Sequence, residues 1–383
     1  MKKTTVLLLA AMLLTCCTSE SEVNAQTNDG QGATVYFTSD ITAESLVKIY
    51  EALGVSPTAT QRVGVKISTG ESAQSNYLRP DFIKPLVQKV GGNIVECNTA
   101  YGGYRMSTAS HRQQIAERGF NDVATVDIMD EEGTVNLPVA DTKHLQYDIV
   151  GSHIQNYDFI INLAHFKGHS MGGFGGVLKN QSIGFASTTG KVYIHTAGSR
   201  TSGGIWYNNN QEANQLAFLE SMAAAAQAVH NYFKQEGRDI IYINVMNNLS
   251  VDCDCDGHPA SPEMKDIGIL ASTDPVALDK ACLDLVFNYN STTSDNAVPL
   301  QNRINRQHGT HIVDYAEQIG LGTKSYQLIS LDQSSSIEGT RSAGSLRYNV
   351  YSLDGRKVLT NAASLDGLQK GTYIINGEKR IVE

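Results

Sequence analysis

A short segment of this sequence concentrates side chains that can hold ligands and move protons. Residues 163–180 read LAHFKGHSMGGFGGVLKN, with two histidines, two lysines and five glycines. Imidazole changes its protonation near neutral pH, and glycine lets the backbone approach a ligand closely. The P-loop pattern Gly-x-x-x-x-Gly-Lys-Ser/Thr is absent. We predict a loop that binds a ligand or cofactor through Gly172, Gly173, Gly175 and Gly176.

Five side chains are candidates for the chemistry itself. They are Arg79, His111, His169, Lys179 and His195. An arginine can hold a carboxylate through a two-pronged contact, and a lysine amine can bind a cofactor covalently. Each residue also has a structural explanation. Arg79 could form a surface ion pair, Lys179 could be a solvated loop lysine, and the histidines could hydrogen-bond the backbone or brace loops.

Cys253 and Cys255 alternate with aspartates in the segment VDCDCDGH, which ends at His258. Alternating Asp and Cys with a nearby His is typical of metal ligation. A four-iron cluster typically needs four thiolates, and the remaining cysteines beyond the N-terminal region are Cys97 and Cys282. Because Cys282 falls in an apolar helical pattern, we expect no iron–sulfur cluster. We expect a divalent metal site at the two cysteines, and a disulfide without metal is the alternative.

Short strands and helices must position these side chains. The runs 62–67, 93–97, 159–163 and 240–245 predict strands, and 43–53, 79–90, 215–233 and 274–286 predict helices. The run 192–195, which ends in His195, is a further candidate strand. This alternation predicts an α/β fold with a largely parallel sheet. Proteins of this class bind ligands at the carboxyl ends of their strands, where the glycine-rich loop begins.

Three runs in the sequence resemble a known protein family. They are HFKGHxxGGFGGxLKN from His165, NTAYGGxR from Asn98, and DIGILASTDPVALDK from Asp266. The family has no assigned function, and its members are often labelled uncharacterised iron–sulfur centre proteins. The resemblance covers most of residues 35–325.

The same segments are more distantly similar to lactate racemase and its nickel-pincer relatives. This resemblance implies a lactate-racemase-like fold with a two-part core. It implies acid/base roles for His111 and His169, and a carboxylate clamp at Arg79. It also implies that Lys179 anchors a cofactor or substrate and that His195 ligates a metal, nickel or zinc.

The N-terminal residues are typical of a cleavable export signal. Lys2-Lys3 precedes the apolar run Val6–Leu14, which predicts a signal peptide over residues 1–25. The run is too short to span a bilayer, which needs ~20 apolar residues. Two kinds of processing remain open, namely ordinary cleavage and attachment of a lipid at Cys16 or Cys17.

The rest of the chain divides by composition. We expect an α/β core in two parts, 34–238 and 239–330, then a serine-rich linker at 331–341. Residues 342–383 contain Asp-Gly and Asn-Gly between alternating apolar residues, which predicts β-hairpins. The pieces YSLDGRKV and GLQKGTYI resemble the C-terminal sorting domain of the type IX secretion system of Bacteroidota. A generic small β-module is the alternative.

The net charge of −9 argues against nucleic acid as a partner, because phosphates attract basic surfaces. We expect an exported protein at the cell surface, in the periplasm or outside the cell, associated with the outer membrane through its tail or a lipid anchor. Its partner would be a small anionic ligand or substrate. The leading function is a racemase- or epimerase-like metalloenzyme that moves a proton or hydride at the α-carbon of a small hydroxy acid or carboxylate. The alternative is a non-catalytic protein that binds a metal or an anion.

Overall fold

The computed structural model describes residues 32–205, 212–332, 348–352, 357–362, 368, 370–375 and 378–382. The chain forms two compact units, Met1–Asp332 and Gln333–Glu383. The predicted signal peptide and most of the predicted linker lie outside the described residues. None of the described helices is long and apolar enough to cross a membrane.

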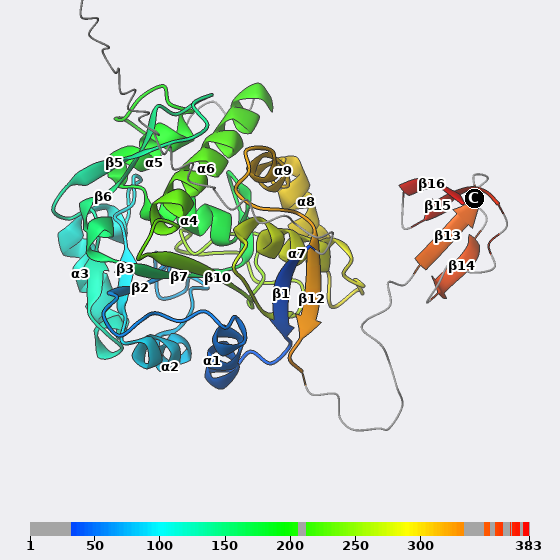
Figure 1. Cartoon of the computed structure of the whole chain (residues 1–383), viewed down its shortest axis with the longest axis horizontal. Helices are drawn as coiled ribbons and strands as arrows, with labels where there is room; N and C mark the ends of the chain where they lie inside the picture. Colours follow the sequence, from blue (N-terminus) through cyan, green and yellow to red (C-terminus); the bar gives the residue numbers. More distant parts are fainter. Residues whose placement is uncertain are drawn as a thin grey trace, which may run out of the picture. The chain divides into compact units, whose positions relative to one another are not determined.

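An eight-stranded sheet runs through the first unit (Figure 1). All but one of its strands point the same way. Only β11 is antiparallel to its neighbours. The predicted α/β fold with a largely parallel sheet is therefore confirmed. In spatial order the strands are β12 (Tyr326–Ser330), β1 (Ala33–Thr38), β11 (Gly268–Ser272), β10 (Asp239–Met246), β7 (Phe159–His165), β2 (Val63–Lys66), β3 (Asn93–Glu96) and β4 (Val126–Ile128).

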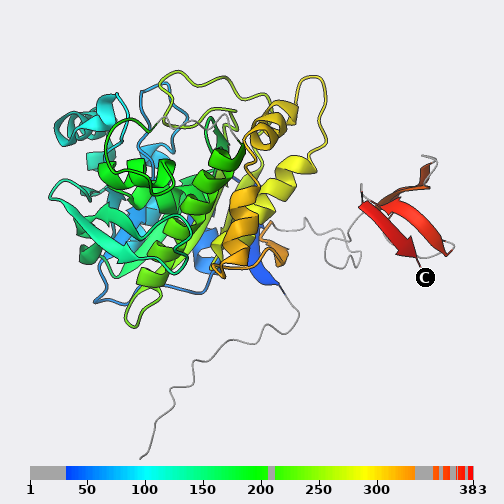
Figure 2. The same cartoon turned by 90° about the horizontal axis from the view of Figure 1, so that it is seen from above.

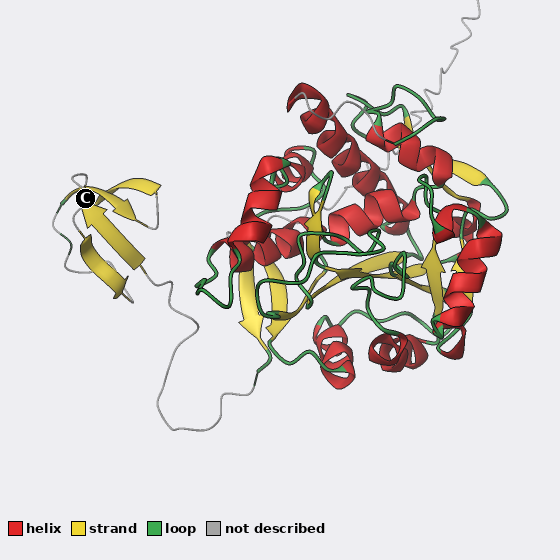
Figure 3. Cartoon of the chain, turned by 180° about the vertical axis from the view of Figure 1, so that it is seen from behind, coloured by secondary structure: helices red, strands yellow, loops and turns green. Residues whose placement is uncertain are grey.

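Helices cover both faces of this sheet (Figure 3). Apolar side chains of three helices form one core cluster with the sheet: α1 (Ala43–Ala52), α2 (Pro80–Val90) and α3 (Thr108–Glu117). Six helices share the opposite cluster: α4 (Val177–Phe185), α5 (Thr188–His195), α6 (Glu212–Phe233), α7 (Pro275–Phe287), α8 (Val298–Arg306) and α9 (His311–Gln318). Because both faces are covered, a strand such as β7 is buried along its whole length and reads as an apolar run.

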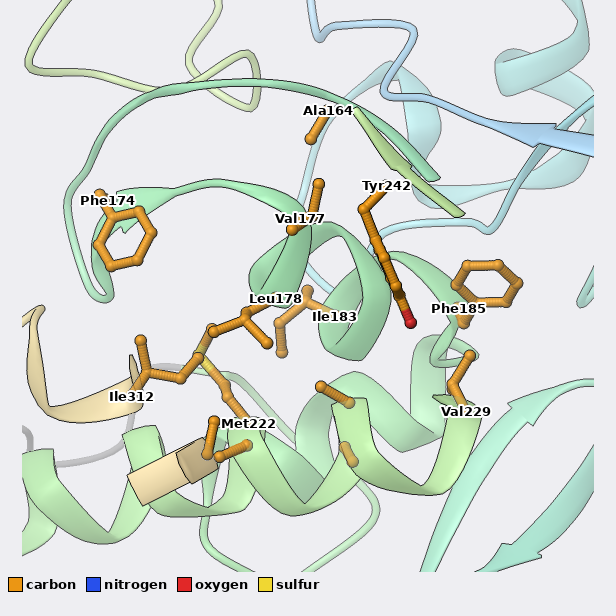
Figure 4. Packing of buried hydrophobic residues seen from close by; sticks show 14 of the residues in the cluster. Ala164, Phe174, Val177, Leu178, Ile183, Phe185, Met222, Val229, Tyr242 and Ile312 are labelled. Atoms are coloured by element: carbon orange, nitrogen blue, oxygen red, sulfur yellow. The ribbon is translucent and has the colours of Figure 1, made fainter. Parts of the chain in front are cut away.

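The two core clusters follow from the alternation of side chains along each strand. On β10, Ile241 and Ile243 join the cluster with α1 and α2, whereas Tyr242 joins the cluster with α4 and α6. In Figure 4 the side chains of Val177 and Met222, from α4 and α6, belong to this second cluster. Viewed from above, the green and yellow helices lie side by side (Figure 2), and α6 packs against α4, α5 and α9.

Smaller elements connect these layers. They are the hairpins β5 (Thr134–Pro138) with β6 (Tyr147–Gly151) and β8 (Lys167–His169) with β9 (Gly173–Gly175), and the 3-10 turns η1 (Tyr104–Met106), η2 (Phe120–Asp122) and η3 (Ser152–Asn156). The glycine-rich loop that follows β7 therefore folds as a hairpin that leads directly into α4.

One sequence-based expectation differs from the structure. The run 192–195 is the end of helix α5 and not a strand. Ser187 caps α5 by accepting a hydrogen bond from the Gly190 backbone N–H, and the helix packs on α6. In addition, both expected core parts, 34–238 and 239–330, contribute strands to the same sheet of a single compact unit.

The second unit contains a four-stranded antiparallel sheet in the order β14-β13-β15-β16. Its strands are β13 (Tyr348–Ser352), β14 (Lys357–Ala362), β15 (Gly371–Ile375) and β16 (Glu378–Val382). This unit is β-structured, as the hairpin signals in its sequence predict.

Candidate functional site

A cavity of about 560 Å³ lies at the carboxyl ends of β2, β3, β7 and β10. These strands and the loops that follow them contribute Lys66, Glu96, His165 and Asp254 to its lining, and α4 contributes Lys179. Its volume falls within the range of pockets that bind small molecules. Parallel α/β proteins place their ligands at this edge of the sheet.

Three lysines in the cavity lack a carboxylate partner. Lys66 and Lys191 are buried and Lys179 is half-buried, and none of the three forms an ion pair with the residues that the structure describes. The Lys66 ammonium donates to the Ile67 carbonyl (2.6 Å), and that of Lys191 donates to the Ala186 carbonyl. Buried charges are costly without a counter-charge. The cavity therefore favours an anionic ligand that can supply that charge.

The ammonium of Lys179 forms no hydrogen bond or ion pair with any described residue. Burial, and after it the positive charge of Lys167, together lower its pKa from 10.5 to about 7. A lysine with this pKa is partly neutral at physiological pH, so its amine can accept a proton or attack a carbonyl carbon.

The position of Lys179 is fixed by the start of α4. Asp279 of α7 accepts the backbone N–H groups of Val177 and Leu178, each at 3.0 Å, and so caps a helix whose own N-cap residue, Gly176, has no side chain to do so. A Cβ atom on Gly176 would lie 2.3 Å from the Asp279 carboxylate, so glycine is required at this position. Burial raises the pKa of Asp279 to about 6.

Asn180 connects the same helix to the sheet. Its amide nitrogen donates to the Lys66 carbonyl (3.1 Å) and to the Asn162 side chain (2.8 Å). The next residue after Lys179 is therefore bonded to both β2 and β7. Burial also lowers the pKa of the neighbouring Lys66, to about 8.

His169 and His195 both line the cavity, but they present opposite tautomers. His169 Nδ1 accepts the backbone N–H groups of Met171 (3.2 Å) and Gly172 (2.8 Å), which leaves the proton on Nε2. His195 Nδ1 donates to the Lys191 carbonyl (2.6 Å), which leaves a lone pair on Nε2. Burial lowers the pKa of His195 to about 4, and it lowers that of His169 well below its usual value. Both rings are therefore neutral at pH 7.

Arg105 lies at the cavity wall with its guanidinium bonded to protein groups. It donates to Glu71 (3.2 Å), Glu96 (2.6 Å) and the hydroxyl of Tyr101 (2.8 Å). Burial opposes ionisation of Glu96, but Arg105 and then His111 outweigh it and hold the pKa of that carboxyl well below its usual value. This network makes the wall rigid and leaves little of the arginine charge for a ligand.

Two of the five candidate side chains for the chemistry lie outside the cavity lining. His111 is fully buried, and its ring nitrogens contact Asn98 (3.2 Å) and Glu96 (3.3 Å). Arg79 is exposed at the start of α2, where its guanidinium lies 3.9 Å from the centre of the Tyr77 ring. His111 thus lies behind the cavity wall, and Arg79 lies on the protein surface. Of the predicted glycines, Gly175 and Gly176 line the cavity, whereas Gly172 and Gly173 do not.

Cys253 and Cys255 are joined by a disulfide on the cavity wall. Asp254 between them is buried and bonds His165 Nδ1 and Lys167 Nζ, each at 2.7 Å. Burial raises the pKa of Asp254, but Lys167 and His165 outweigh it and keep the group ionised. The pair predicted to bind metal is therefore oxidised in this structure.

Two groups of described side chains have the spacing to hold a metal ion. They are His169 with Cys253 and Cys255, and Asp127 with Glu131 and His153. His195, the predicted ligand, belongs to neither group. The first group does not fit a metal as it stands, because a disulfide offers no thiolate and the proton of His169 occupies Nε2.

Several residues of the site were missed by the sequence analysis. Lys66 and Lys191 are the most important, because they supply unpaired positive charge. Lys66 carries a weak signal, since a lysine at the end of an otherwise apolar strand is unusual for a buried position. Lys191 carries none that distinguishes it from a surface helix lysine. The arrangement as a whole can bind a small anion and transfer a proton through Lys179.

The chain is similar to two solved structures at low sequence identity. No curated protein sequence matches the chain. Among solved structures, the lactate racemase apoprotein from Thermoanaerobacterium thermosaccharolyticum is 14% identical, with a TM-score of 0.37, and the match covers 66% of this chain and 56% of that one. A protein from Thermotoga maritima is 11% identical, also with a TM-score of 0.37, over 72% of this chain and 58% of that one. The chain thus spans little more than half the length of either.

A family model gives a more specific result. It matches residues 63–284, which is more than half of the chain and includes the glycine-rich loop, α4 and the disulfide. The chain belongs to the family described as Domain of unknown function (DUF362).

Proposed function

We propose that this protein is an enzyme that binds a small carboxylate and moves a proton at the carbon next to the carboxylate, with Lys179 as the proton-transferring group. The observation that carries the proposal is the Lys179 amine, which faces a cavity with no protein partner among the described residues and has a pKa of about 7. A group whose pKa lies near the working pH is the most effective acid/base catalyst.

The substrate class follows from the charge of the cavity. The ammonium groups of Lys66 and Lys191 bond only to neutral groups. The positive potential around Lys179 comes from Lys167, Arg105 and Lys66. A carboxylate would compensate that potential. Nearby positive charge would also stabilise the enolate-like charge that develops when the α-proton leaves.

His195 would be the second polar group for the substrate. Its bare Nε2 can accept a hydrogen bond from a hydroxyl, so a 2-hydroxy acid is the form of carboxylate that suits the cavity best. The acid/base roles expected for His111 and His169 pass in this proposal to Lys179. No step is assigned to a metal.

A non-catalytic anion-binding protein is the second candidate. The observation that favours it is again the group of cavity lysines without carboxylate partners among the described residues. These charges suffice to bind an anion without any reaction. The two candidates differ only in what happens to the bound anion.

Isotope exchange separates these functions. The purified full chain would be incubated in deuterated water with a panel of small 2-hydroxy acids, lactate first, and the α-proton signal followed by NMR. We expect exchange with at least one compound and a loss of roughly 100-fold or more in Lys179→Met, the usual size of a general acid/base contribution. Lys89→Met is the matched control, because Lys89 is exposed and pairs with Glu51.

Binding would be measured on the same samples by calorimetry. Binding of a hydroxy acid without exchange would support the anion-binding candidate and refute the enzyme. Equal exchange rates in wild type and Lys179→Met would show that another group moves the proton. Failure of all small carboxylates to bind would refute both candidates.

We also propose that the protein is exported. Support comes from the basic and apolar N-terminal run and from the sorting-domain resemblance of residues 342–383. Cell fractionation and N-terminal sequencing of the mature chain would test this. A full-length chain in the cytoplasm would refute it.

A further inference from the structure

We propose that the Cys253–Cys255 disulfide is a redox-active pair that undergoes thiol–disulfide exchange with a small dithiol entering the cavity, with His169 as hydrogen-bond donor to the Cys255 sulfur. This activity is separate from the proposed proton transfer. Three features of the structure support it, namely the access of the pair to the cavity, the orientation of His169 and the attachment of the loop.

Access comes from the place of the two cysteines in the fold. Both line the cavity; Cys253 is buried and Cys255 is half-buried. Cys255 is therefore the sulfur that an incoming thiolate can reach. By contrast Cys97 and Cys282 are buried free thiols, and burial raises the pKa of each thiol strongly. The disulfide is thus the reactive sulfur centre of the described chain.

The His169 ring is oriented toward the same sulfur. Its Nε2 lies 4.0 Å from Cys255 Sγ, within hydrogen-bond distance for sulfur. The backbone N–H groups of Met171 and Gly172 occupy Nδ1, so Nε2 carries the proton and can only donate. A donor at this place stabilises a thiolate on Cys255 and has no comparable effect on the neutral disulfide.

The loop is held by bonds that do not depend on the disulfide. The Asp254 carboxylate is fixed by His165 and Lys167, and its carbonyl accepts the Glu71 backbone N–H at 2.8 Å. The Asp256 carbonyl accepts the Ser75 hydroxyl at 2.6 Å. These bonds would keep the two thiols adjacent after reduction, so the disulfide could form again without refolding.

A purely structural role explains the pair poorly. Only one residue separates the two cysteines. A cross-link stabilises a fold mainly by restricting the unfolded chain, and the effect grows with the length of the loop that it closes. The small loop that this disulfide closes restricts the unfolded chain very little.

The reaction consists of two thiol–disulfide exchange steps, and each step breaks one S–S bond as it forms another. A thiolate of the dithiol attacks Cys255 Sγ, the S–S bond breaks, and Cys253 leaves as a thiolate. The second thiolate of the dithiol then attacks the first sulfur of the same dithiol, which is now bonded to Cys255 Sγ. That S–S bond breaks, and Cys255 leaves as the thiolate that His169 stabilises. The dithiol loses two electrons and becomes a cyclic disulfide, the cysteine pair gains them, and the two protons pass from the dithiol to the cysteines.

Dithiothreitol is the probe for this exchange. The folded full chain would be equilibrated with mixtures of reduced and oxidised dithiothreitol, alkylated, and analysed by intact mass and peptide mapping, with circular dichroism recorded in parallel. We expect Cys253 and Cys255 to be alkylated together, reversibly, while Cys97 and Cys282 stay unmodified and the spectrum is unchanged. Reduction that occurs only when the spectrum reports unfolding would overturn the proposal, and this measurement needs no variant.

The role of His169 would be tested by the rate of reduction. Loss of its hydrogen bond to the thiolate should slow the release of Cys255 about tenfold in His169→Leu, which has no donor, and His258→Leu should react like the wild type. His258 is the matched control because it lies in the same loop but is exposed, and among the described residues its ring bonds only to the Gly257 carbonyl. Equal rates in both variants would remove His169 from the proposal. Tight stoichiometric zinc uptake by the reduced chain would show that the thiols are metal ligands, and it would overturn the exchange role.

Discussion

Replacing Lys179 with methionine should stabilise the protein at neutral pH and abolish the proposed activity. The lysine is a half-buried cation without a protein partner in the described chain, and its pKa falls from 10.5 to about 7. Methionine keeps most of the apolar volume of the side chain and removes the charge. The variant therefore separates stability from function, as residues selected for catalysis often do.

The size of the effect follows from the pKa. At 1.36 kcal/mol per pKa unit, the fall from 10.5 to about 7 corresponds to roughly 5 kcal/mol against the charged form. Because the side chain is half-buried, water screens part of that cost, and we expect a gain of about 2–3 kcal/mol in the free energy of unfolding at pH 7.

The pKa shift of Lys179 also determines how the free energy of unfolding changes with pH. In the unfolded chain this lysine stays protonated up to its ordinary pKa of 10.5, whereas in the folded chain it loses its proton above about 7. The unfolded state binds more protons in that interval, so the stability of the wild type rises with pH between 7 and 10.5. The advantage of Lys179→Met should accordingly be largest at or below pH 7 and become small near pH 10.

Urea unfolding at pH 7 and pH 10 would measure both effects, with Lys89→Met as the surface control. The reasoning is refuted if Lys179→Met is less stable than the wild type at pH 7, or if its advantage is the same at both pH values. Either result would mean that the ammonium has a counter-charge in solution and that the amine is not poised near neutrality.

Three other perturbations test how the site is held. Asp279→Ala removes the acceptor of two backbone N–H groups at the start of α4 and should cost about 3 kcal/mol in urea unfolding. Gly176→Ala places a Cβ 2.3 Å from Asp279 and should lower the melting temperature measured by calorimetry, whereas Gly102→Ala, with open space around it, should not. A chain ending at Asp332 should bind anions in calorimetry as the full chain does, because every residue that lines the cavity belongs to the first unit. Unchanged stability in the first two variants, or lost binding in the third, would contradict this account of the site.

The sheet and the location of the site could be predicted from the sequence because their signals are local. The apolar run of β7 predicts a strand covered on both faces, and the cap residues Thr42 and Asp274 mark the starts of α1 and α7. The chemistry-bearing loop after β7 then falls at the carboxyl edge of the sheet by topology alone. For this reason Lys179, His169 and His195 do meet at one cavity.

The identity of the charged groups at the cavity could not be predicted in the same way. Arg79 and Arg105 are both arginines close to loops, and their local sequences do not distinguish them. The difference between them comes from contacts with residues elsewhere in the fold. Arg105 is enclosed by Glu71 and Glu96, and Arg79 is exposed. Lys66 likewise gains its role from burial and from Asn180, a partner 114 positions away. Burial and distant partners leave almost no trace in the local sequence.

The tautomers of the histidines could not be predicted from the sequence either. From the sequence, His111 and His169 are predicted to act in acid/base chemistry and His195 to ligate a metal, and the hydrogen bonds of the fold make the three rings different. Two backbone N–H groups fix the proton of His169 on Nε2, and a carbonyl fixes the proton of His195 on Nδ1. The cavity therefore contains one imidazole that can only donate toward the cavity and one that can only accept, while His111 bonds to Glu96 and Asn98 behind the wall. A hydroxy acid needs both kinds of partner, and in the proposed function the lysine ammonium groups would donate to its carboxylate while His195 Nε2 would accept from its hydroxyl. Backbone groups thus set the polarity of the site before any substrate binds.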